Sequence, residues 1–307
     1  MYDLFLTGAS GFLGSRLLEQ LDPAAFSTIT LLCRSEPVLP ARLAAAANVE
    51  VVRASLAQVE RYAGRLGPET VVLHLAAVTG KADRAEYFSV NTHATGLLVS
   101  AAEQAGVAGF LFISSIAVSF SERQGYHYAE SKEQAEQLLQ DSELSWCILR
   151  PTIILGEASP IWQSFLALAR KPLIVLPGDG RTLIQPIEVN DLVRLMLDIV
   201  STGRFDNEVL EIGGPDTISL DEFVQKIRTA IGSRRARIVH LPLGLLLGTL
   251  RAVERVFPSL LPVSSGQFAS FCNDGTVTDN ELIIPADGKL SGVDDMLQQL
   301  AGGKGDD

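Results

Sequence analysis

The chain has 307 residues, of which 47% are hydrophobic and 20% are charged. This composition excludes a disordered or fibrous protein and suits one large α/β unit or two closely joined ones. The 25 basic and 36 acidic side chains give a formal net charge of −11. Because such a surface repels phosphate backbones and anionic lipid heads, we expect no nucleic-acid partner. An anionic ligand would have to be held locally, by helix N-termini and single arginines.

The three cysteines, Cys33, Cys147 and Cys272, are odd in number and lie in apolar runs. They are typical of small core residues in a reducing cytoplasm. No group of Cys and His has metal-ligand spacing, so no metal site is predicted. The chain begins directly with a predicted strand, without a signal peptide, and its longest charge-free stretch, 105–121, is too short and too punctuated for a transmembrane segment. We therefore expect a cytoplasmic protein.

The first 150 residues alternate short apolar runs with helical patterns. The uncharged runs predict strands that are buried on both faces of a parallel sheet, and they cover residues 4–6, 29–33, 51–52, 71–75, 110–113 and 147–149. The stretches 11–21, 83–104 and 128–140 between them are predicted as helices. Repeated βα units predict an α/β fold with a doubly wound parallel sheet of the Rossmann type.

After residue 151 the pattern changes, because Pro and Gly divide the chain into short elements. Residues 219–222, Ser-Leu-Asp-Glu, form a capping box that predicts the start of a helix. We expect a Rossmann domain at 1–155, to which a segment near 185–201 returns, and a smaller C-terminal α/β substrate lobe at 156–307. The apolar segment 238–257 leaves open a contact with a membrane surface or a partner.

Residues 7–14, Thr-Gly-Ala-Ser-Gly-Phe-Leu-Gly, follow the first predicted strand and open a helix. In such a turn Gly8 permits the tight bend, Gly11 lets the backbone approach a pyrophosphate, and Gly14 lets helix and strand pack closely. The helix N-terminus, with Ser10, Phe12 and Leu13 in the turn, would then face the phosphates with free N–H groups. The alternative is a glycine-rich turn without a ligand, but the strand–turn–helix context favours a dinucleotide site.

The second predicted strand ends in Arg34 and Ser35. A site specific for NAD normally places an acidic residue here to accept from the ribose 2′-hydroxyl, whereas an NADP site places an arginine. Arg34 could bind the 2′-phosphate, with Ser35 donating a further hydrogen bond. The alternative is that Arg34 is a solvated surface arginine. We expect the site to favour NADP(H) over NAD(H).

Tyr128 and Lys132 are four residues apart and share one face of a predicted helix. A free tyrosine has a pKa near 10 and is a poor acid or base at neutrality. A lysine ammonium and a cationic nicotinamide beside the phenol would lower this pKa toward about 7. Ser114 and Ser115 end the preceding strand, at the sheet edge where active sites of such folds lie.

With these motifs in their order, the chain resembles the extended short-chain dehydrogenases/reductases, also called the NAD-dependent epimerase/dehydratase family. The resemblance rests on residues 7–14, His74 to Ala77, Asn91, Ser114 and Ser115, Tyr128 and Lys132, Arg150 to Thr152, and Gly213 to Pro215. These motifs are spread over about two thirds of the chain. The second lobe, including 185–191 and 241–257, looks most like relatives of the 39 kDa NADPH-binding subunit of respiratory complex I.

The resemblance implies that Tyr128 is the acid/base, that Lys132 holds the nicotinamide ribose, and that Ser115 hydrogen-bonds the reacting oxygen. It further implies that Leu75, Ala76 and Ala77 line the cofactor and that the backbone of Pro151, Thr152 and Ile153 meets the carboxamide. For Asn91 two interpretations stay open, a buried helix hydrogen bond and a place in a proton-relay water chain.

The sequence also departs from the family. Ile116 and Ala117 stand where dehydratases carry an acid pair, so elimination of water is not expected. Ser55 and Leu56 stand where the family usually has an acid near the adenine. Only 12 residues separate Ser115 from Tyr128, which shortens a stretch that helps to wall the substrate pocket.

We therefore expect an enzyme that transfers hydride between NADP(H) and a carbonyl/alcohol substrate by a Ser-Tyr-Lys mechanism. Two alternatives remain, a non-catalytic NADPH-binding structural or redox-sensing protein and a sugar-nucleotide epimerase. The helices at 83–104 and 128–140 would offer an interface for a homodimer.

Overall fold

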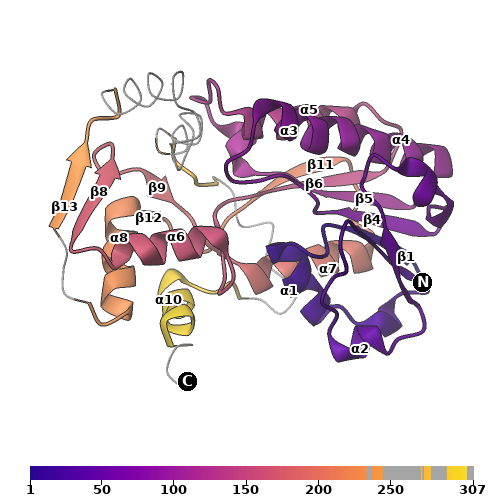
Figure 1. Cartoon of the computed structure of the whole chain (residues 1–307), viewed down its shortest axis with the longest axis horizontal. Helices are drawn as coiled ribbons and strands as arrows, with labels where there is room; N and C mark the ends of the chain where they lie inside the picture. Colours follow the sequence, from indigo (N-terminus) through magenta and orange to yellow (C-terminus); the bar gives the residue numbers. More distant parts are fainter. Residues whose placement is uncertain (234–236, 245–270, 272, 278–288, 303–307) are drawn as a thin grey trace. The chain divides into compact units, whose positions relative to one another are not determined.

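The structure, a computed structural model, describes residues 1–233, 237–244, 271, 273–277 and 289–302 (Figure 1). Cys272 and most of the segment 238–257 lie outside the described residues, and so do the expectations that rest on them. The chain divides into two compact units. The first comprises Met1–Val118, His127–Arg150 and Leu192–Leu210, and the second comprises Ser119–Tyr126, Pro151–Asp191 and Glu211–Asp307.

A seven-stranded sheet in the order β11-β6-β5-β4-β1-β2-β3 organises the first unit. The strands are β1 (Asp3–Thr7), β2 (Ile29–Cys33), β3 (Val49–Arg53), β4 (Thr70–His74), β5 (Gly109–Ile113), β6 (Trp146–Pro151) and β11 (Glu208–Ile212). The pairs from β3 across to β6 are parallel. Every residue of β2, β4 and β5 is buried, as their uncharged sequences predicted. The predicted doubly wound sheet is confirmed.

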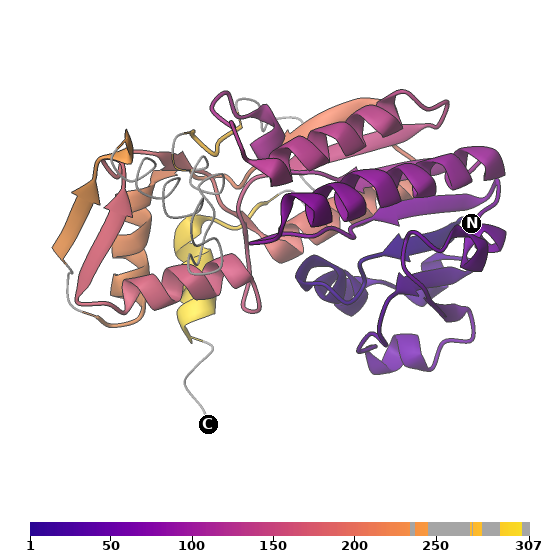
Figure 2. The ribbon, with the colours of Figure 1, turned by 45° about the horizontal axis from the view of Figure 1, so that its top comes forward.

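Helices cover both faces of this sheet: α4 and α5 lie side by side on one face, and α1 and α7 lie on the other (Figures 1 and 2). The helices associated with the first unit are α1 (Phe12–Gln20), α2 (Ala41–Ala44), α3 (Arg84–Tyr87), α4 (Thr95–Ala105), α5 (His127–Gln140) and α7 (Val189–Thr202). Short 3₁₀ turns are η1 (Pro23–Ala25), η2 (Val59–Arg61), η3 (Ala63–Arg65) and η5 (Ile116–Ser119).

The helix predicted at 83–104 has three parts. Between α3 and α4 lies a π-helical segment, η4 (Phe88–Ala94), which the hydrophobic pattern did not predict. π-Helical turns insert one extra residue into an α-helix and occur frequently at functional sites. The buried Asn91 lies within this segment. The composite helix ends at Gly106, whose φ of +63° is the left-handed conformation that glycine adopts without a steric penalty.

The core on the α4/α5 face is built from large side chains of the central strands. Phe5, Phe110 and Phe112 are fully buried and pack in one cluster with Leu98 of α4 and Leu139 of α5. Burying a phenylalanine contributes roughly 1.5–3 kcal/mol. The cluster therefore fixes α4 and α5 against β4 and β5, the elements whose ends carry the predicted site residues.

In its described residues, the second unit has short paired strands beside three helices. Its strands are β7 (Ile154–Leu155), β8 (Leu173–Pro177), β9 (Leu183–Ile184), β10 (Ile187–Glu188), β12 (Ile218–Ser219) and β13 (Arg237–Leu241), and its helices are α6 (Pro160–Ala169), α8 (Leu220–Ala230) and α10 (Val293–Gly302). The pairs β7–β10 and β8–β13 are parallel, whereas β9–β12 is antiparallel. Trp162, Phe165 and Phe223 pack between α6 and α8, and the predicted capping box of Ser219 and Glu222 begins α8.

Within the described residues, no helix combines the length and the apolar character needed to cross a membrane. The same residues hold no group of three or more His, Cys, Asp or Glu side chains arranged for a metal ion.

Candidate active site

At positions 8 and 14, on either side of the turn between β1 and α1, the structure has room for glycine only. Gly8 has φ +78°, and a Cβ there would lie 2.6 Å from the backbone nitrogen of Ala76. A Cβ on Gly14 would lie 2.2 Å from the carbonyl oxygen of Gly8. Both distances are far below van der Waals contact, so the two glycines allow the close packing that the sequence predicted.

Gly11 is the N-cap of α1, and no side chain caps this helix end. Phe12 and Leu13 form the first turn of the helix. The first N–H groups of a helix have no partner within the helix, and the helix dipole makes this end positive. The end of α1 can therefore bind an anion such as a pyrophosphate.

A cavity of about 390 Å³ lies at the carboxyl ends of β1 to β4. Predicted site residues that line it are Gly8, Ser10, Gly11, Arg34, Ser55, Leu56, Leu75, Ala76 and Ala77. Ligands of open α/β sheets bind at this edge. Phe12, Leu13, Gly14, Ser35, Asn91, Ser115, Tyr128 and Lys132 belong to the same unit without lining this cavity.

At one end of the cavity, the exposed Arg34 follows β2 and Ser35 comes next. Glu36, the acidic residue nearest to Arg34 in the sequence, forms an ion pair with Arg53 at 3.0 Å. After the neighbouring strand β3, the amide nitrogen of Ser55 donates to the side chain of Gln58 at 2.9 Å. The wall at Leu56 is fixed by Tyr62, whose hydroxyl donates to the Leu56 carbonyl at 2.8 Å.

His74 ends β4 as a hydrogen-bonded core residue. Its ring nitrogens bond to the hydroxyls of Thr7 and Thr95 at 2.6 and 2.9 Å. Burial, together with the charge of Lys132, lowers the pKa of His74 to about 3. The ring is therefore neutral at physiological pH and serves to join β1, β4 and α4.

Lys132 is 2% exposed and lies on α5 facing the end of β5. Its ammonium donates to the carbonyl of Ile113 at 2.6 Å and lies 4.0 Å from the centre of the Phe112 ring. Burial lowers the pKa of Lys132 to about 7, against an opposing effect of Glu136. Glu136, one turn further on, is buried and accepts two hydrogen bonds from Arg150 Nε and one from Nη2, at 3.0, 3.2 and 2.6 Å.

Tyr128 and Ser115 come together as the sequence predicted, because their side chains share a hydrogen bond. The pKa of Tyr128 differs from the expectation. Tyr128 is half-buried, and desolvation raises the pKa of its phenol to about 12, although the bond with Ser115 acts in the opposite direction. The expected value near 7 assumed an ammonium and a cationic nicotinamide beside the phenol, and the protein alone does not produce it.

Asn91 is 1% exposed and uses its whole amide group. Its oxygen accepts from the backbone nitrogen of Val78 at 2.7 Å, and its nitrogen donates to the Val78 carbonyl at 3.0 Å and to the Ser131 hydroxyl at 3.1 Å. The buried hydrogen bond, one of the two interpretations of this residue, is thus present.

The other predicted residues belong to the second unit. Pro151 ends β6, and the next residue, Thr152, donates its backbone N–H to Ile212 at 2.8 Å and its hydroxyl to the carbonyl of Gln185. Ile153 packs against the core of this unit.

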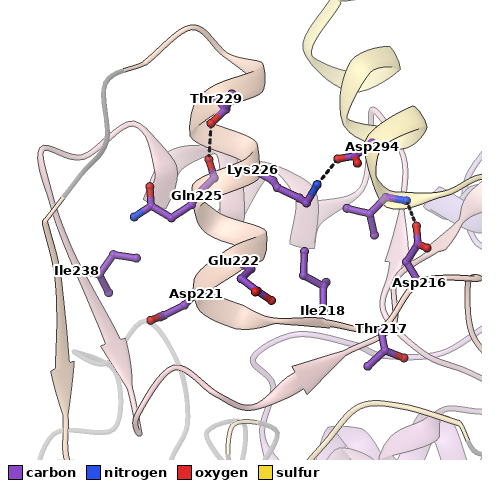
Figure 3. A pocket seen from close by; sticks show the side chains of 11 residues that line it. Asp216, Thr217, Ile218, Asp221, Glu222, Gln225, Lys226, Thr229, Ile238 and Asp294 are labelled. Carbon is purple, nitrogen blue, oxygen red and sulfur yellow. Dashed lines mark hydrogen bonds and ion pairs between the residues drawn. The ribbon is translucent and has the colours of Figure 1, made fainter.

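The second unit also has a cavity of its own, of about 860 Å³, that sequence reasoning missed (Figure 3). It lies beside α8 and α10, and several of its charged side chains have partners. Lys226 pairs with Asp294 at 2.5 Å, Asp221 pairs with His240 at 3.0 Å, and Asp216 accepts from the backbone of Val293 at 2.7 Å. Only the capping box at the start of α8 signalled this region in the sequence.

Sequence reasoning also missed part of the first cavity's wall. Ala54, Ala57, Val78, Ser89, Val90 and Ala94 line it as well. These small or apolar side chains carry no chemical signal, and Ser89, Val90 and Ala94 belong to the unpredicted segment η4.

Comparison with known proteins agrees with this geometry. A family model described as NAD(P)H-binding matches residues 8–161, half of the chain. The chain is 26% identical over 292 residues to N-acetyl-alpha-D-glucosaminyl-diphospho-ditrans,octacis-undecaprenol 4-epimerase of Escherichia coli O157:H7, covering 88% of this chain and 85% of that protein. It is 25% identical over 266 residues to dTDP-4-dehydro-6-deoxy-D-allose reductase of a Streptomyces species, covering 75% and 81%.

Among solved structures, UDP-glucuronic acid 4-epimerase from Bacillus cereus in complex with NAD is similar, with a TM-score of 0.65 and 20% identity over 87% of this chain and 94% of that one. This likeness shows the shared fold. The match to the family model and the order of the motifs agree on the same group of proteins. The chain therefore belongs to the NAD(P)H-binding family, among the extended short-chain dehydrogenases/reductases that include NAD-dependent epimerases, dehydratases and reductases.

Proposed function

We propose that this protein is an oxidoreductase that moves hydride between NADP(H) and a carbonyl or alcohol substrate by a Ser-Tyr-Lys mechanism. One observation carries the proposal: Tyr128 bonds to Ser115 in the same unit whose strand ends form a cavity of about 390 Å³ lined by the glycine-rich turn. A structural binder has no need of a phenol held in this way.

The residues present fit a dinucleotide. Gly8 and Gly14 leave no space for a Cβ, and the uncapped end of α1 suits a pyrophosphate. In our proposal Ser10, Gly11, Phe12 and Leu13 hold the pyrophosphate, Arg34 and Ser35 hold the 2′-phosphate, and Ser55, Leu56, Leu75, Ala76 and Ala77 line the rest, while Pro151, Thr152 and Ile153 meet the carboxamide. When bound, the nicotinamide gives or accepts the hydride.

The side chains around Tyr128 have distinct tasks in this scheme. With a pKa of about 12 the phenol is protonated near neutrality, so it can donate a proton to a carbonyl oxygen as that oxygen gains negative charge. Ser115 donates a second hydrogen bond to the same oxygen. Lys132 holds the ribose and, when protonated, stabilises the phenolate that remains. We also propose the second interpretation of Asn91, in which this residue is part of a water chain that returns a proton.

Nucleotide-linked sugars are the substrate class that the relatives suggest, because the similar reductase and epimerases are named for such compounds. A sugar-nucleotide epimerase is the second candidate, favoured by the similarity to a UDP-glucose 4-epimerase. The long match to the Escherichia coli enzyme, which is named for a sugar linked through diphosphate to a polyprenol, supports epimerisation of the sugar but not a nucleotide carrier. In that reaction the same hydride is taken and returned to the other face of the sugar carbon, so no net cofactor is consumed.

A panel assay separates these functions. NADPH absorbance is followed with 4-keto nucleotide sugars and simple carbonyl compounds, while NADP⁺ with UDP-glucose and UDP-N-acetylglucosamine is analysed for epimers by chromatography. We expect NADPH to be consumed with at least one carbonyl compound, and that loss to disappear in Tyr128→Phe. Epimers without net NADPH loss would favour the second candidate. No reaction in either arm, with tight NADPH binding, would favour a structural or redox-sensing protein.

We propose that residues 1–155 with a return near 185–201 act as the cofactor domain and 156–307 as the substrate lobe. Two copies would pair through α4 and α5, where Leu138 is 41% exposed beside Gly96. The free, buried thiols of Cys33 and Cys147 are consistent with a reducing cytoplasm. The likeness of the second lobe to relatives of the complex I subunit stays a prediction.

A further inference from the structure

Tyr87, the last residue of α3, packs against the predicted acid. It is 4% exposed, and its ring centre lies 6.1 Å from that of Tyr128 at an interplanar angle of 61°. Edge-to-face pairs at this separation are favourable and directional. The ring of Tyr87 therefore restricts where the ring of Tyr128 can lie.

The other end of the Tyr87 side chain contacts the loop after β4. Its hydroxyl donates to the carbonyl of Gly80, and the backbone of Ala82 also hydrogen-bonds to it. This loop continues from Leu75, Ala76, Ala77 and Val78, which line the dinucleotide cavity. A single side chain thus joins the loop of the cavity to the catalytic helix.

Neighbouring contacts make the same connection. Phe88 faces His127 with ring centres 6.4 Å apart, and the Thr92 hydroxyl donates to the Ser131 carbonyl at 2.9 Å. From the same segment, Ser89 and Val90 line the cavity. Residues 84–92 therefore contact the cavity loop on one side and the first turn of α5 on the other.

We propose that Tyr87 is a positioning residue that couples dinucleotide binding to the placement of Tyr128. This inference rests on the proposed role of Tyr128 as acid. Its two ends have separate tasks: the hydroxyl ties the cavity loop to α3, and the ring orients the phenol. A dinucleotide that orders the loop at 75–80 thereby orders the first turn of α5.

Tyr62 provides a matched control. It is fully buried, and its hydroxyl also donates to a carbonyl of the cavity wall, that of Leu56, at 2.8 Å. Its ring, however, packs on Phe5, with centres 5.6 Å apart. Tyr62→Phe removes the same kind of hydrogen bond from the same cavity without changing the ring that faces Tyr128.

Hydrogen exchange, read peptide by peptide with and without saturating NADPH, tests the coupling without a substrate. We expect NADPH to slow exchange at the backbone of 127–133 in the wild type and in Tyr62→Phe. In Tyr87→Phe most of that slowing should be lost, while NADPH still protects residues 8–15. The proposal would be overturned if NADPH did not slow exchange at 127–133 in the wild type. It would also be overturned if NADPH slowed exchange there equally in Tyr87→Phe and in the wild type.

Turnover with a substrate from the panel separates the two ends of the side chain. Tyr87→Leu should lower kcat by about 10- to 100-fold, the effect of misplacing a catalytic group by about 1 Å. Tyr87→Phe should restore most of that kcat, because it keeps the ring, yet weaken NADPH binding about 2- to 10-fold, as loss of one hydrogen bond does. An unchanged kcat in folded Tyr87→Leu contradicts the inference.

Failure of the proposed function has a different signature. Tyr128→Phe with full turnover would remove the acid role itself, whatever the Tyr87 variants do. Should Tyr87→Leu not fold, the exchange experiment on Tyr87→Phe still decides the coupling, because that variant changes only a hydroxyl.

Discussion

Asn91 binds both polar groups of the Val78 backbone with one side-chain amide, at 2.7 Å to the N–H and 3.0 Å to the carbonyl. The same amide nitrogen reaches the hydroxyl of Ser131 on α5. A side chain of the π-helical segment thus makes, with this loop, the pair of backbone hydrogen bonds that a neighbouring strand makes within a sheet. This contact supports the part of the cavity wall that follows Ala77.

Replacing Asn91 with leucine should therefore cost stability and cofactor affinity together. The change leaves the N–H and carbonyl of Val78 without their side-chain partner, a loss of about 1–3 kcal/mol in the free energy of unfolding. Urea titration measures this loss, and nicotinamide fluorescence measures the weaker NADPH binding. Asn48→Leu is the control, because Asn48 also donates to two backbone carbonyls, at 2.9 Å each, but away from the cavity. Equal NADPH affinity in both variants would contradict the prediction.

Arg34→Asp should abolish the preference for NADPH over NADH. A charge-assisted phosphate contact contributes on the order of 1.5–3 kcal/mol, so wild type should bind NADPH roughly ten- to a hundredfold more tightly than NADH. The variant should lose this advantage and keep its affinity for NADH. Fluorescence titration of both cofactors checks it, with Arg65→Gln as the control for a surface arginine that pairs with Glu50. Wild type that binds NADH as well as NADPH would refute the assignment.

Tyr128→Phe should lower turnover by about 10²–10⁴-fold with a nearly unchanged dissociation constant for NADPH, because only the proton is lost. Lys132→Met should lower the rate and weaken cofactor binding, since this lysine is proposed to touch the ribose as well. The double variant should be little worse than the more damaged single one, because residues that act as a unit are not additive. Steady-state kinetics and fluorescence titration give both values, and additive losses would argue against one catalytic unit.

The same Lys132→Met variant should be more stable than wild type near neutrality. In the folded chain the pKa of Lys132 is about 7, whereas an unfolded lysine titrates near 10.4. Between these values the unfolded chain binds more protons, so wild type loses stability as pH falls from about 10.4 to 7. The advantage of Lys132→Met should thus grow over the same interval. Urea unfolding at pH 7 and 9.5 tests this, and an advantage that is larger at pH 9.5 would contradict it.

The chain is expected not to dehydrate nucleotide sugars. Ile116 and Ala117 are buried at 7% and 3% exposure and offer no group that could protonate a leaving hydroxyl. Incubation with dTDP-glucose and NAD⁺, followed by mass spectrometry, should show no loss of water. Appearance of a 4-keto-6-deoxy product would overturn this expectation.

The fold could be predicted where the sequence carries a repeating physical signal. The apolar runs became strands, and β2, β4 and β5 are buried along their whole length, which excludes charge. The run at 51–52 is the exception to the predicted burial, because β3 also contains Glu50 and Arg53 and none of its residues is buried. The glycines at 8, 11 and 14 predicted the turn, because at Gly8 and Gly14 a side chain would collide with the backbone.

Other features depend on tertiary context. A π-helical turn has nearly the same residue preferences as an α-helix, so η4 was hidden within the predicted helix at 83–104. The raised pKa of Tyr128 depends on how many atoms surround its hydroxyl, which spacing alone does not reveal. Tyr87 gave no signal because an aromatic residue at the end of a helix usually marks only a core contact.

The first unit consists of three separate chain segments, and its edge strand β11 together with most of α7 is encoded after residue 190. During synthesis on a ribosome, β6 therefore emerges long before its neighbour β11 exists. While some forty residues of the second unit are synthesised, β6 is an unpaired edge strand of the nascent sheet. An unpaired edge strand can form hydrogen bonds with another chain. A truncation near residue 155 would make that transient edge permanent.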